Sequence, residues 1–387
     1  MKQWIKHEWK NIQTSPLLRT LIQADKNVPE TFVNGEKKIL AASNNYLGLA
    51  TDTRVVSEAK EALDRFGTGS GGSRLTTGNL EIHEKLEQEL ACFKRAESCL
   101  LYSSGFLANL GVITALSDEE TIIFSDALNH ASIIDACRLT KAKVVIYGHT
   151  DMKDLEEKLT AYRTHSKKII VTDGVFSMDG DLAPLDAICF LKEKHEALLI
   201  VDDAHGTGVI GEKGRGTVDY FQTNVDITIG TLSKAVGSEG GFVCAKREII
   251  DLLIQRSRPF IFQTALAPAS VAAALKSIDI IQTEPERQAR LLAIGQTLRD
   301  ALSSLGYVIP EGVTPIIPII IGDAKKTVDQ QAFLDQHSIF IPAIRPPTVP
   351  DETSRLRCTL MATHTDDHVH TIIKAFEKSV DLKLRME

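Results

Sequence analysis

Seven short apolar segments rich in β-branched residues recur between residues 98 and 244. They lie at 100–102, 121–124, 144–147, 169–172, 198–201, 227–229 and 241–244. Most are separated by stretches that can hold a helix, such as 154–159, and Pro184 stands where a first helical turn would begin. Continuous apolar strands that alternate with helices predict a mostly parallel sheet covered on both faces. We therefore expect an α/β fold with a seven-stranded sheet.

The chain has a different pattern on either side of this region. Apolar residues at helical spacing predict an amphipathic helix over 80–94. Residues 283–305 have the pattern of one long polar helix, followed by apolar runs at 316–321 and 339–344, a proline-rich loop at 345–350, and a last strand and helix. We expect an N-terminal arm at 1–40, a large domain at 41–280 and a smaller C-terminal α+β domain at 281–387.

Composition and charge exclude several classes of protein. The chain has 44 Lys and Arg against 51 Asp and Glu, a net charge of −7, which is unfavourable for a nucleic-acid-binding surface. No apolar run approaches the ~20 residues of a membrane span, and the first residues lack the apolar segment of a secretory signal. The six cysteines are scattered without a CxxC pair. We expect a cytoplasmic protein with reduced thiols and neither a nucleic-acid nor a membrane partner.

A glycine-rich segment and a histidine cluster are weak evidence for a dinucleotide site and a metal site. Residues 67–72 match G-x-G-x-x-G, but a helical segment precedes them, so a flexible loop is favoured over a dinucleotide site. His364, His368 and His370 cluster near the C-terminus without a cysteine or another histidine beside them. We interpret them as a solvated helix face and expect no metal.

The first segment with candidate chemistry is 227–237. Here a lysine, Lys234, follows a buried strand through a turn that bears hydroxyl groups, and Ala235 and Gly237 leave room for a flat ring. A sheltered lysine has a lowered pKa and can form an imine. The alternative is a solvated charge in a turn.

The second and third segments are 198–208 and 100–109. In the second, Asp202, Asp203 and His205 follow an apolar strand, at the edge where open α/β sheets bind ligands. A buried carboxylate there needs a cationic partner, such as the ring nitrogen of pyridoxal phosphate, although a capping or metal-binding role is also open. In the third, a strand turns through Ser-Ser-Gly into a helix, which either binds phosphate or is an ordinary capped turn.

Together the three segments resemble pyridoxal phosphate-dependent transferases of fold type I, the aspartate-aminotransferase fold. Residues 231–240 resemble the lysine signature of class II aminotransferases. Residues 43–49, 69–74, 173–180 and 202–206 are similar to the α-oxoamine synthases, and the resemblance extends over nearly the whole chain. The segment 343–350, followed by 355–357, is similar to the branch of that family that serves biotin synthesis.

The resemblance implies a role for each matching residue. Lys234 would hold the cofactor and move the proton, Asp202 would pair with the pyridinium nitrogen, and His130 would stack on the ring. His205 and Ser177 would lie at the phenolic oxygen of the cofactor. His205 is a catalytic candidate, as are Lys234, Asp202 and His130. The residues implied to hold the phosphate are Gly105, Phe106 and Thr231. The residues implied to bind substrate are Arg19, Asn45, His130, Thr348 and Arg357.

The biotin-pathway branch condenses L-alanine with a pimeloyl thioester and releases CO₂ and a thiol. The resemblance also implies a homodimer with its active site at the subunit interface. One alternative is another α-oxoamine synthase, such as a glycine C-acetyltransferase, because one methyl group is worth only about 1–3 kcal/mol of discrimination. The other is a protein of this fold that binds without catalysis, against which the intact Lys234, Asp202 and His205 argue.

Overall fold

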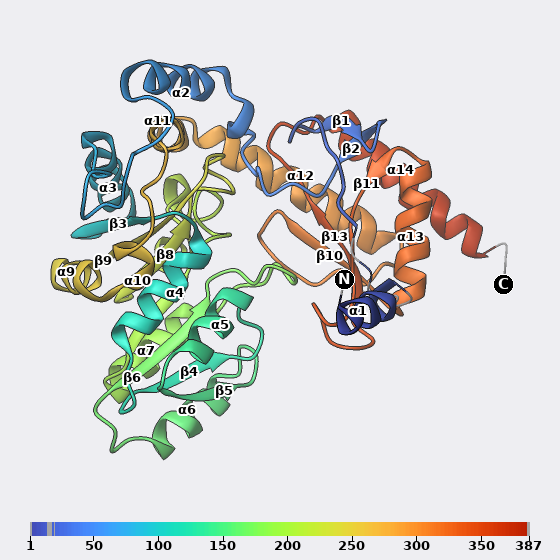
Figure 1. Ribbon diagram of the computed structural model, residues 1–387. Helices are drawn as coiled ribbons and strands as arrows, with labels where there is room; N and C mark the ends of the chain where they lie inside the picture. Colours follow the sequence, from blue (N-terminus) through green and yellow to red (C-terminus); the bar gives the residue numbers. More distant parts are fainter. Residues whose placement is uncertain (1, 14–17, 19, 385–387) are drawn as a thin grey trace.

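A seven-stranded sheet organises the larger part of the chain (Figure 1). The structure is a computed structural model that describes residues 2–13, 18 and 20–384. The strand order across the sheet is β3-β9-β8-β7-β6-β4-β5, and β9 alone runs in the direction opposite to the other six strands. This confirms the mostly parallel sheet that the apolar segments predict. Its strands are β3 (Ser98–Tyr102), β4 (Ile122–Asp126), β5 (Lys143–Tyr147), β6 (Lys168–Asp173), β7 (Leu198–Asp202), β8 (Ile227–Thr231) and β9 (Gly241–Ala245).

The sheet is apolar on both faces, and its central strands β6, β7 and β8 are buried except at Leu198, the first residue of β7. Ile169 and Val171 of β6 pack into one core cluster and Ile170 into another, as the two-residue repeat of a strand requires. Helices α4 (Gly105–Leu116), α5 (Ala131–Leu139), α9 (Arg247–Arg256) and α10 (Arg258–Ile261) supply the first cluster. Helices α6 (Met152–Ala161) and α7 (Leu185–His195) supply the second.

Three helices pack together beside the β3 end of the sheet, where α3 contacts β3 and α11 lies between α2 and α3. They are α2 (Thr53–Phe66), α3 (Glu81–Lys94) and α11 (Pro268–Thr283), and α3 confirms the amphipathic helix predicted over 80–94. The glycine-rich segment 67–72 follows α2 and forms a loop, as its context indicates. Short helical turns complete this part of the chain: η1 (Leu49–Thr51), η2 (Glu212–Gly214) and α8 (Thr217–Tyr220).

The C-terminal part packs helices on a three-stranded antiparallel sheet of order β10-β13-β12. Pro342 separates β11 from β12, so the apolar run at 339–344 forms two short strands. His364 is buried and precedes α14, which corrects the interpretation of it as part of a solvated helix face. The elements are α12 (Pro285–Ser304), β10 (Ile316–Gly322), α13 (Ala324–Gln336), β11 (Ile339–Phe340), β12 (Ala343–Ile344), β13 (Ser354–Thr359) and α14 (Asp366–Leu384).

The N-terminal segment joins the C-terminal part through strand pairing. After α1 (Gln3–Gln13), the strands β1 (Glu30–Val33) and β2 (Glu36–Leu40) form a hairpin, and β2 pairs in parallel with β11. Asn34 and Gly35 turn the hairpin with φ of 50° and 82°, the left-handed conformations that a tight two-residue turn needs. Residues 30–40 therefore lie against the smaller part of the molecule (Figure 1).

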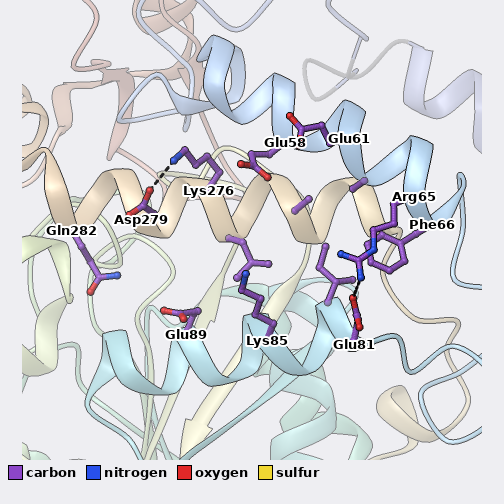
Figure 2. Close-up of a pocket in the computed structure, with 14 residues that line it drawn as sticks. Glu58, Glu61, Arg65, Phe66, Glu81, Lys85, Glu89, Lys276, Asp279 and Gln282 are labelled. Carbon is purple, nitrogen blue, oxygen red and sulfur yellow. Dashed lines mark hydrogen bonds and ion pairs between the residues drawn. The ribbon is translucent and has the colours of Figure 1, made fainter.

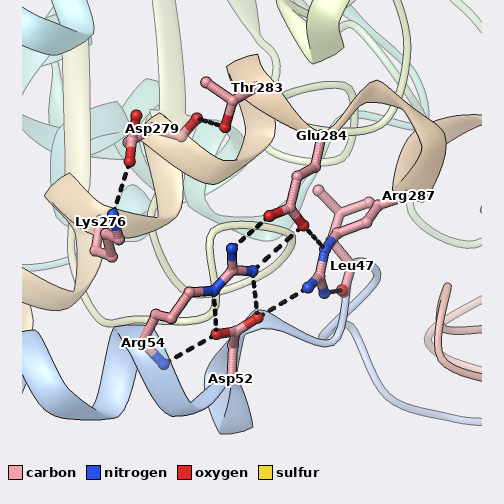
Figure 3. Close-up of polar contacts among 8 residues, drawn as sticks. All are labelled: Leu47, Asp52, Arg54, Lys276, Asp279, Thr283, Glu284 and Arg287. Atoms are coloured by element: carbon pink, nitrogen blue, oxygen red, sulfur yellow. Dashed lines mark hydrogen bonds and ion pairs between the residues drawn. The ribbon is translucent and has the colours of Figure 1, made fainter.

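A network of charged side chains ties the start of α2 to the junction between α11 and α12 (Figure 3). Asp52 caps α2 and accepts hydrogen bonds from Arg54 and Arg287. Glu284, at the junction, accepts from the same two arginines. Arg54 is the main cause that lowers the pKa of Asp52 to about 2, so the network stays ionised near neutral pH. Arg287 also donates to the backbone carbonyl of Leu47, at 3.2 Å, and so holds the segment 43–49.

Helices of the described residues are too short or too polar to cross a lipid bilayer.

Candidate active site

The candidate site forms where the parallel strands β6, β7 and β8 end. Asp173 and Asp202 are register partners at the ends of β6 and β7, and Thr231 ends β8. Lys234 follows in the loop after β8. Because parallel strands end at the same edge, residues far apart in sequence meet there.

Lys234 and His205 are in direct contact. Their Nζ and Nε2 atoms lie 2.7 Å apart. Burial lowers the pKa of Lys234 to about 8, an effect that Arg357 reinforces and that Asp202 and Asp173 oppose. An amine with this pKa is neutral in a substantial fraction near pH 8, which a nucleophile or a proton acceptor needs.

His205 is buried and hydrogen bonded at both ring nitrogens. Its Nδ1 lies 2.7 Å from the hydroxyl of Tyr46. Burial lowers the pKa of His205 well below its ordinary value, and the charges of Lys234 and Arg357 act in the same direction. The imidazole is therefore neutral near pH 7 and can relay hydrogen bonds without adding charge to the site.

The two adjacent carboxylates at the end of β7 differ in their partners. Asp203 pairs with the Nζ of Lys94 at 2.6 Å and accepts two hydrogen bonds from Thr217. Asp202 accepts hydrogen bonds from the Nδ2 of Asn109 at 2.6 Å and the backbone N–H of Ala204 at 3.0 Å. Among the described residues, no cation lies within ion-pair distance of Asp202. This buried carboxylate fits the protonated ring nitrogen of pyridoxal phosphate.

The start of α4 fits the phosphate of the cofactor. Ser104 caps the helix by accepting a hydrogen bond from the N–H of Leu107, at 3.2 Å. The N–H groups of Gly105 and Phe106 lie in the first turn, where no intrahelical acceptor exists. A Cβ at Gly105 would lie 3.3 Å from the Cβ of Thr231, so glycine keeps the space beside Thr231 open.

Arg357 provides a buried positive charge without an ion pair. It lies on β13, its Nε donates to the backbone carbonyl of Ser177, and its Nη1 lies 3.5 Å from the Oδ1 of Asn44. Within the described residues no carboxylate reaches it, whereas Arg355 on the same strand pairs with Asp179. A buried guanidinium of this kind fits the carboxylate of a substrate.

Other predicted residues have local partners. The side chain of Asn45 donates to the carbonyl of Asn27 at 3.0 Å and accepts from the N–H of Ala50 at 3.2 Å, so the amide beside Arg357 is that of Asn44. The side chain of Thr348 is exposed on the loop before β13. Arg19 lies outside the described residues. The roles of these residues remain predictions.

His130 caps α5 at the edge of the site. Its backbone N–H donates to Asp173 at 2.6 Å, and its Nδ1 lies 2.7 Å from the Oγ of Ser132. Part of the residue is exposed, so the ring is accessible to a ligand. The sequence did not single out Tyr46, Asn109, Ser132 or Asp173. Each lies in or beside a segment that resembles the family, but only the folded chain shows which side chains face the site.

A cavity of about 700 Å³ lies away from this site, between α2, α3 and α11 (Figure 2). Its lining side chains carry both signs of charge, and several are paired with each other, as Arg65 is with Glu81 and Lys276 is with Asp279. None of the predicted site residues lines it.

Comparisons with known proteins agree with this geometry. The family of class I and II aminotransferases matches residues 36–376. An 8-amino-7-oxononanoate synthase from Lysinibacillus sphaericus is 50% identical over 98% of both chains. A solved serine palmitoyltransferase from S. paucimobilis with a bound PLP–myriocin aldimine superposes with a TM-score of 0.92 and 31% identity over 98% of both chains. A solved 8-amino-7-oxononanoate synthase from Francisella tularensis has a TM-score of 0.78 and 28% identity over 90% of this chain and 99% of its own.

The chain therefore belongs to the class I and II aminotransferase family, and its cofactor is pyridoxal phosphate. Within that family it belongs to the 8-amino-7-oxononanoate synthases, which are pyridoxal phosphate-dependent acyltransferases. The fold is shared with serine palmitoyltransferase, so fold alone does not separate these acyltransferases. The 50% identity to the Lysinibacillus sphaericus synthase, against 31% to the palmitoyltransferase, does.

Proposed function

We propose that the protein condenses L-alanine with a pimeloyl thioester to give 8-amino-7-oxononanoate, CO₂ and a free thiol. The observation that carries this proposal is the grouping of three charged residues, of which Asp202 and Arg357 are buried and Lys234 is partly buried. Lys234 has a pKa lowered to about 8, Asp202 lacks a cationic partner among the described residues, and Arg357 lacks an anionic one there. Together they suit an amino acid bound to pyridoxal phosphate.

Each residue has a defined task in this proposal. Pyridoxal phosphate, when bound, supplies an electron sink for the carbon atom beside the amino group. Asp202 keeps the ring nitrogen protonated, and Arg357 orients the carboxylate of the substrate through two parallel hydrogen bonds. Lys234 first holds the cofactor and then, as a free amine, accepts the proton from the α-carbon of alanine.

The remaining predicted residues hold or enclose the reactants. The helix start at Gly105 and Phe106, with Thr231, would bind the phosphate, and His130 would stack on the ring. The phenolic oxygen would face His205 and Ser177.

Arg19, Asn45 and Thr348 would contribute to substrate binding. The assembly we propose is a cytoplasmic homodimer whose active site lies at the subunit interface. The similarity to 8-amino-7-oxononanoate synthases supports the choice of substrates.

A substrate matrix tests the proposal. L-Alanine, glycine and L-serine are each combined with pimeloyl, acetyl, succinyl and palmitoyl thioesters, and the release of thiol and of CO₂ is measured for each pair. Lys234→Ala serves as the control for turnover that does not need the site. We expect the highest kcat/KM for L-alanine with the pimeloyl thioester. Faster turnover of glycine with acetyl thioester, or of L-serine with palmitoyl thioester, would assign a different reaction to the same site.

A further inference from the structure

A chain of hydrogen bonds connects Asp202 to His130 through two residues that the proposed function leaves without a role. The Nδ2 of Asn109 lies 2.6 Å from the Oδ2 of Asp202 and 2.9 Å from the Oγ of Ser132. The Oγ of Ser132 lies 2.7 Å from the Nδ1 of His130. Asn109 and Ser132 are buried, on α4 and α5, so solvent does not compete for the two hydrogen bonds of Asn109.

The orientation of Asn109 follows from its partner. An ionised carboxylate only accepts hydrogen bonds, so the amide must turn its NH₂ group toward Asp202. The reverse orientation would place two oxygens 2.6 Å apart. The Oδ1 of Asn109 is buried and has no hydrogen-bond partner among the described atoms. A buried acceptor without a partner is unfavourable. It is tolerated at Asn109 because both N–H groups of the same amide are hydrogen bonded, to Asp202 and Ser132.

The direction of every later bond is then determined. The second N–H of Asn109 donates to the Oγ of Ser132, so the hydroxyl hydrogen of Ser132 is free to donate to the Nδ1 of His130. The backbone N–H of Ser132, which can only donate, also faces this Nδ1, at 3.3 Å. Two donors therefore converge on Nδ1, and the neutral ring must carry its proton on Nε2. No described residue is hydrogen bonded to Nε2.

We propose that Asn109 and Ser132 are positioning residues that set the tautomer of His130, so that its Nε2–H is presented to the reactants beside Asp202. This inference rests on the proposed function for the identity of those reactants, but the tautomer itself is a property of the chain alone. No hydrogen bond joins Asn109 to His130, so the effect of Asn109 on the tautomer passes through Ser132. The side-chain amide of Asn109 also binds Asp202. Asn109 thereby links the carboxylate of Asp202 to the imidazole of His130.

Several charged groups act on His130 in addition to its hydrogen bonds. Partial burial lowers the pKa of His130; Asp202 on β7 opposes this, and Lys234 adds to it. Asp173 on β6 binds the backbone N–H of His130, at 2.6 Å. Loss of the Ser132 donor should favour protonation of Nδ1, because the proton would no longer displace a hydrogen bond. The pKa of His130 should therefore rise in variants that break the chain.

Nitrogen-15 NMR of histidine-labelled protein measures the tautomer and the pKa of His130, in the cofactor-loaded and cofactor-free enzyme. The chain has 11 histidines, and the His130→Gln spectrum identifies the signals of His130. We expect the neutral Nε2–H tautomer in the wild type at pH 7.5. Ser132→Ala and Asn109→Ala should each raise the pKa of His130 by about half a unit to one unit, and the double variant by no more than the larger of the two.

Ser379→Ala is the matched control, because it removes another buried serine hydroxyl, bonded at 2.7 Å to Gln330 in the C-terminal part. It should leave the signals of His130 unchanged. In Ser132→Ala we expect kcat to fall several-fold with unchanged affinity for pyridoxal phosphate. An Nδ1–H tautomer or an imidazolium in the wild type would overturn the inference. So would additive effects of Asn109→Ala and Ser132→Ala on the pKa of His130. The NMR readings of tautomer and pKa need no substrate, so they remain valid if the substrate matrix assigns another reaction.

Discussion

Replacing Asp203 with asparagine should destabilise the protein, whereas the same change at Asp202 should mainly impair catalysis. Asp203 is fully buried, and its Oδ2 lies 2.6 Å from the Nζ of Lys94. Its Oδ1 accepts hydrogen bonds from the backbone N–H and the hydroxyl of Thr217, at 2.9 and 2.7 Å. Asparagine keeps the shape of the side chain but leaves the ammonium of Lys94 buried without an anion.

The size of the effect follows from the burial of the pair. Removing one partner of a buried ion pair costs about 3–5 kcal/mol. For 387 residues, an unfolding entropy of about 2.1 cal/mol/K per residue gives about 0.8 kcal/mol/K for one cooperative transition. The melting temperature of Asp203→Asn should therefore fall by about 4–6 °C. Lys94→Met in the same chain should recover much of this loss, because it removes the buried charge left unpaired.

Thermal unfolding of cofactor-free protein, followed by circular dichroism, measures these shifts without the stabilising effect of bound ligand. Asp202→Asn is the matched control, since it makes the same chemical change one residue away and breaks no ion pair. It should shift the melting temperature little and lower kcat at least about a hundredfold while the protein still binds pyridoxal phosphate. A wild-type melting temperature of Asp203→Asn would contradict the structural role of Asp203. Near wild-type turnover of Asp202→Asn would contradict the catalytic role of Asp202.

Three other predictions concern single residues of the site. The rate at which cofactor-free protein attaches pyridoxal phosphate to Lys234 should rise with pH with a midpoint near 8, because the neutral amine reacts; a midpoint near the ordinary 10.5 would contradict a buried amine. Arg357→Lys, which keeps the charge but loses the planar fork, should raise the KM for L-alanine about tenfold or more, while Arg355→Lys should not; equal effects of the two changes in steady-state kinetics would remove Arg357 from the carboxylate site. Thr348→Ala should raise the KM for the acyl thioester and spare the spectral change caused by L-alanine, with the melting temperature as control; unchanged acyl kinetics would remove Thr348 from the acyl site.

Much of the fold could be predicted because helices and strands leave local patterns of apolar residues in the sequence. Each of the seven sheet strands is a short apolar segment bounded by polar residues, and the spacing of Ile82, Leu86, Leu90 and Phe93 is that of the helix α3. The pairing of β2 with β11 joins residues about 300 positions apart, and no local pattern reports it. The burial of His364 also depends on distant packing, and so the histidine cluster alone suggested a solvated helix face.

The site was predictable only where a residue type carries the chemistry. Lys234, Asp202 and His205 are unusual after buried strands, and they meet in the fold as the proposed chemistry needs. Asn44 and Asn45 are adjacent and chemically identical, so only tertiary geometry shows that Asn44 faces Arg357. Tyr46 illustrates a similar limit: its apolar ring suits a core position, and its hydroxyl is seen to reach His205 only once the chain is folded.

The proposed decarboxylative condensation is tested most directly by following the carboxylate carbon of the amino acid. L-Alanine labelled with ¹³C at its carboxylate is incubated with a pimeloyl thioester and the cofactor-loaded protein, and labelled CO₂, free thiol and the product mass are measured together. The proposed reaction predicts that labelled CO₂, thiol and an unlabelled 8-amino-7-oxononanoate form in equal amounts, and that Lys234→Ala forms none of them. Release of thiol without labelled CO₂, or a product that retains the label, would contradict decarboxylative condensation at this site.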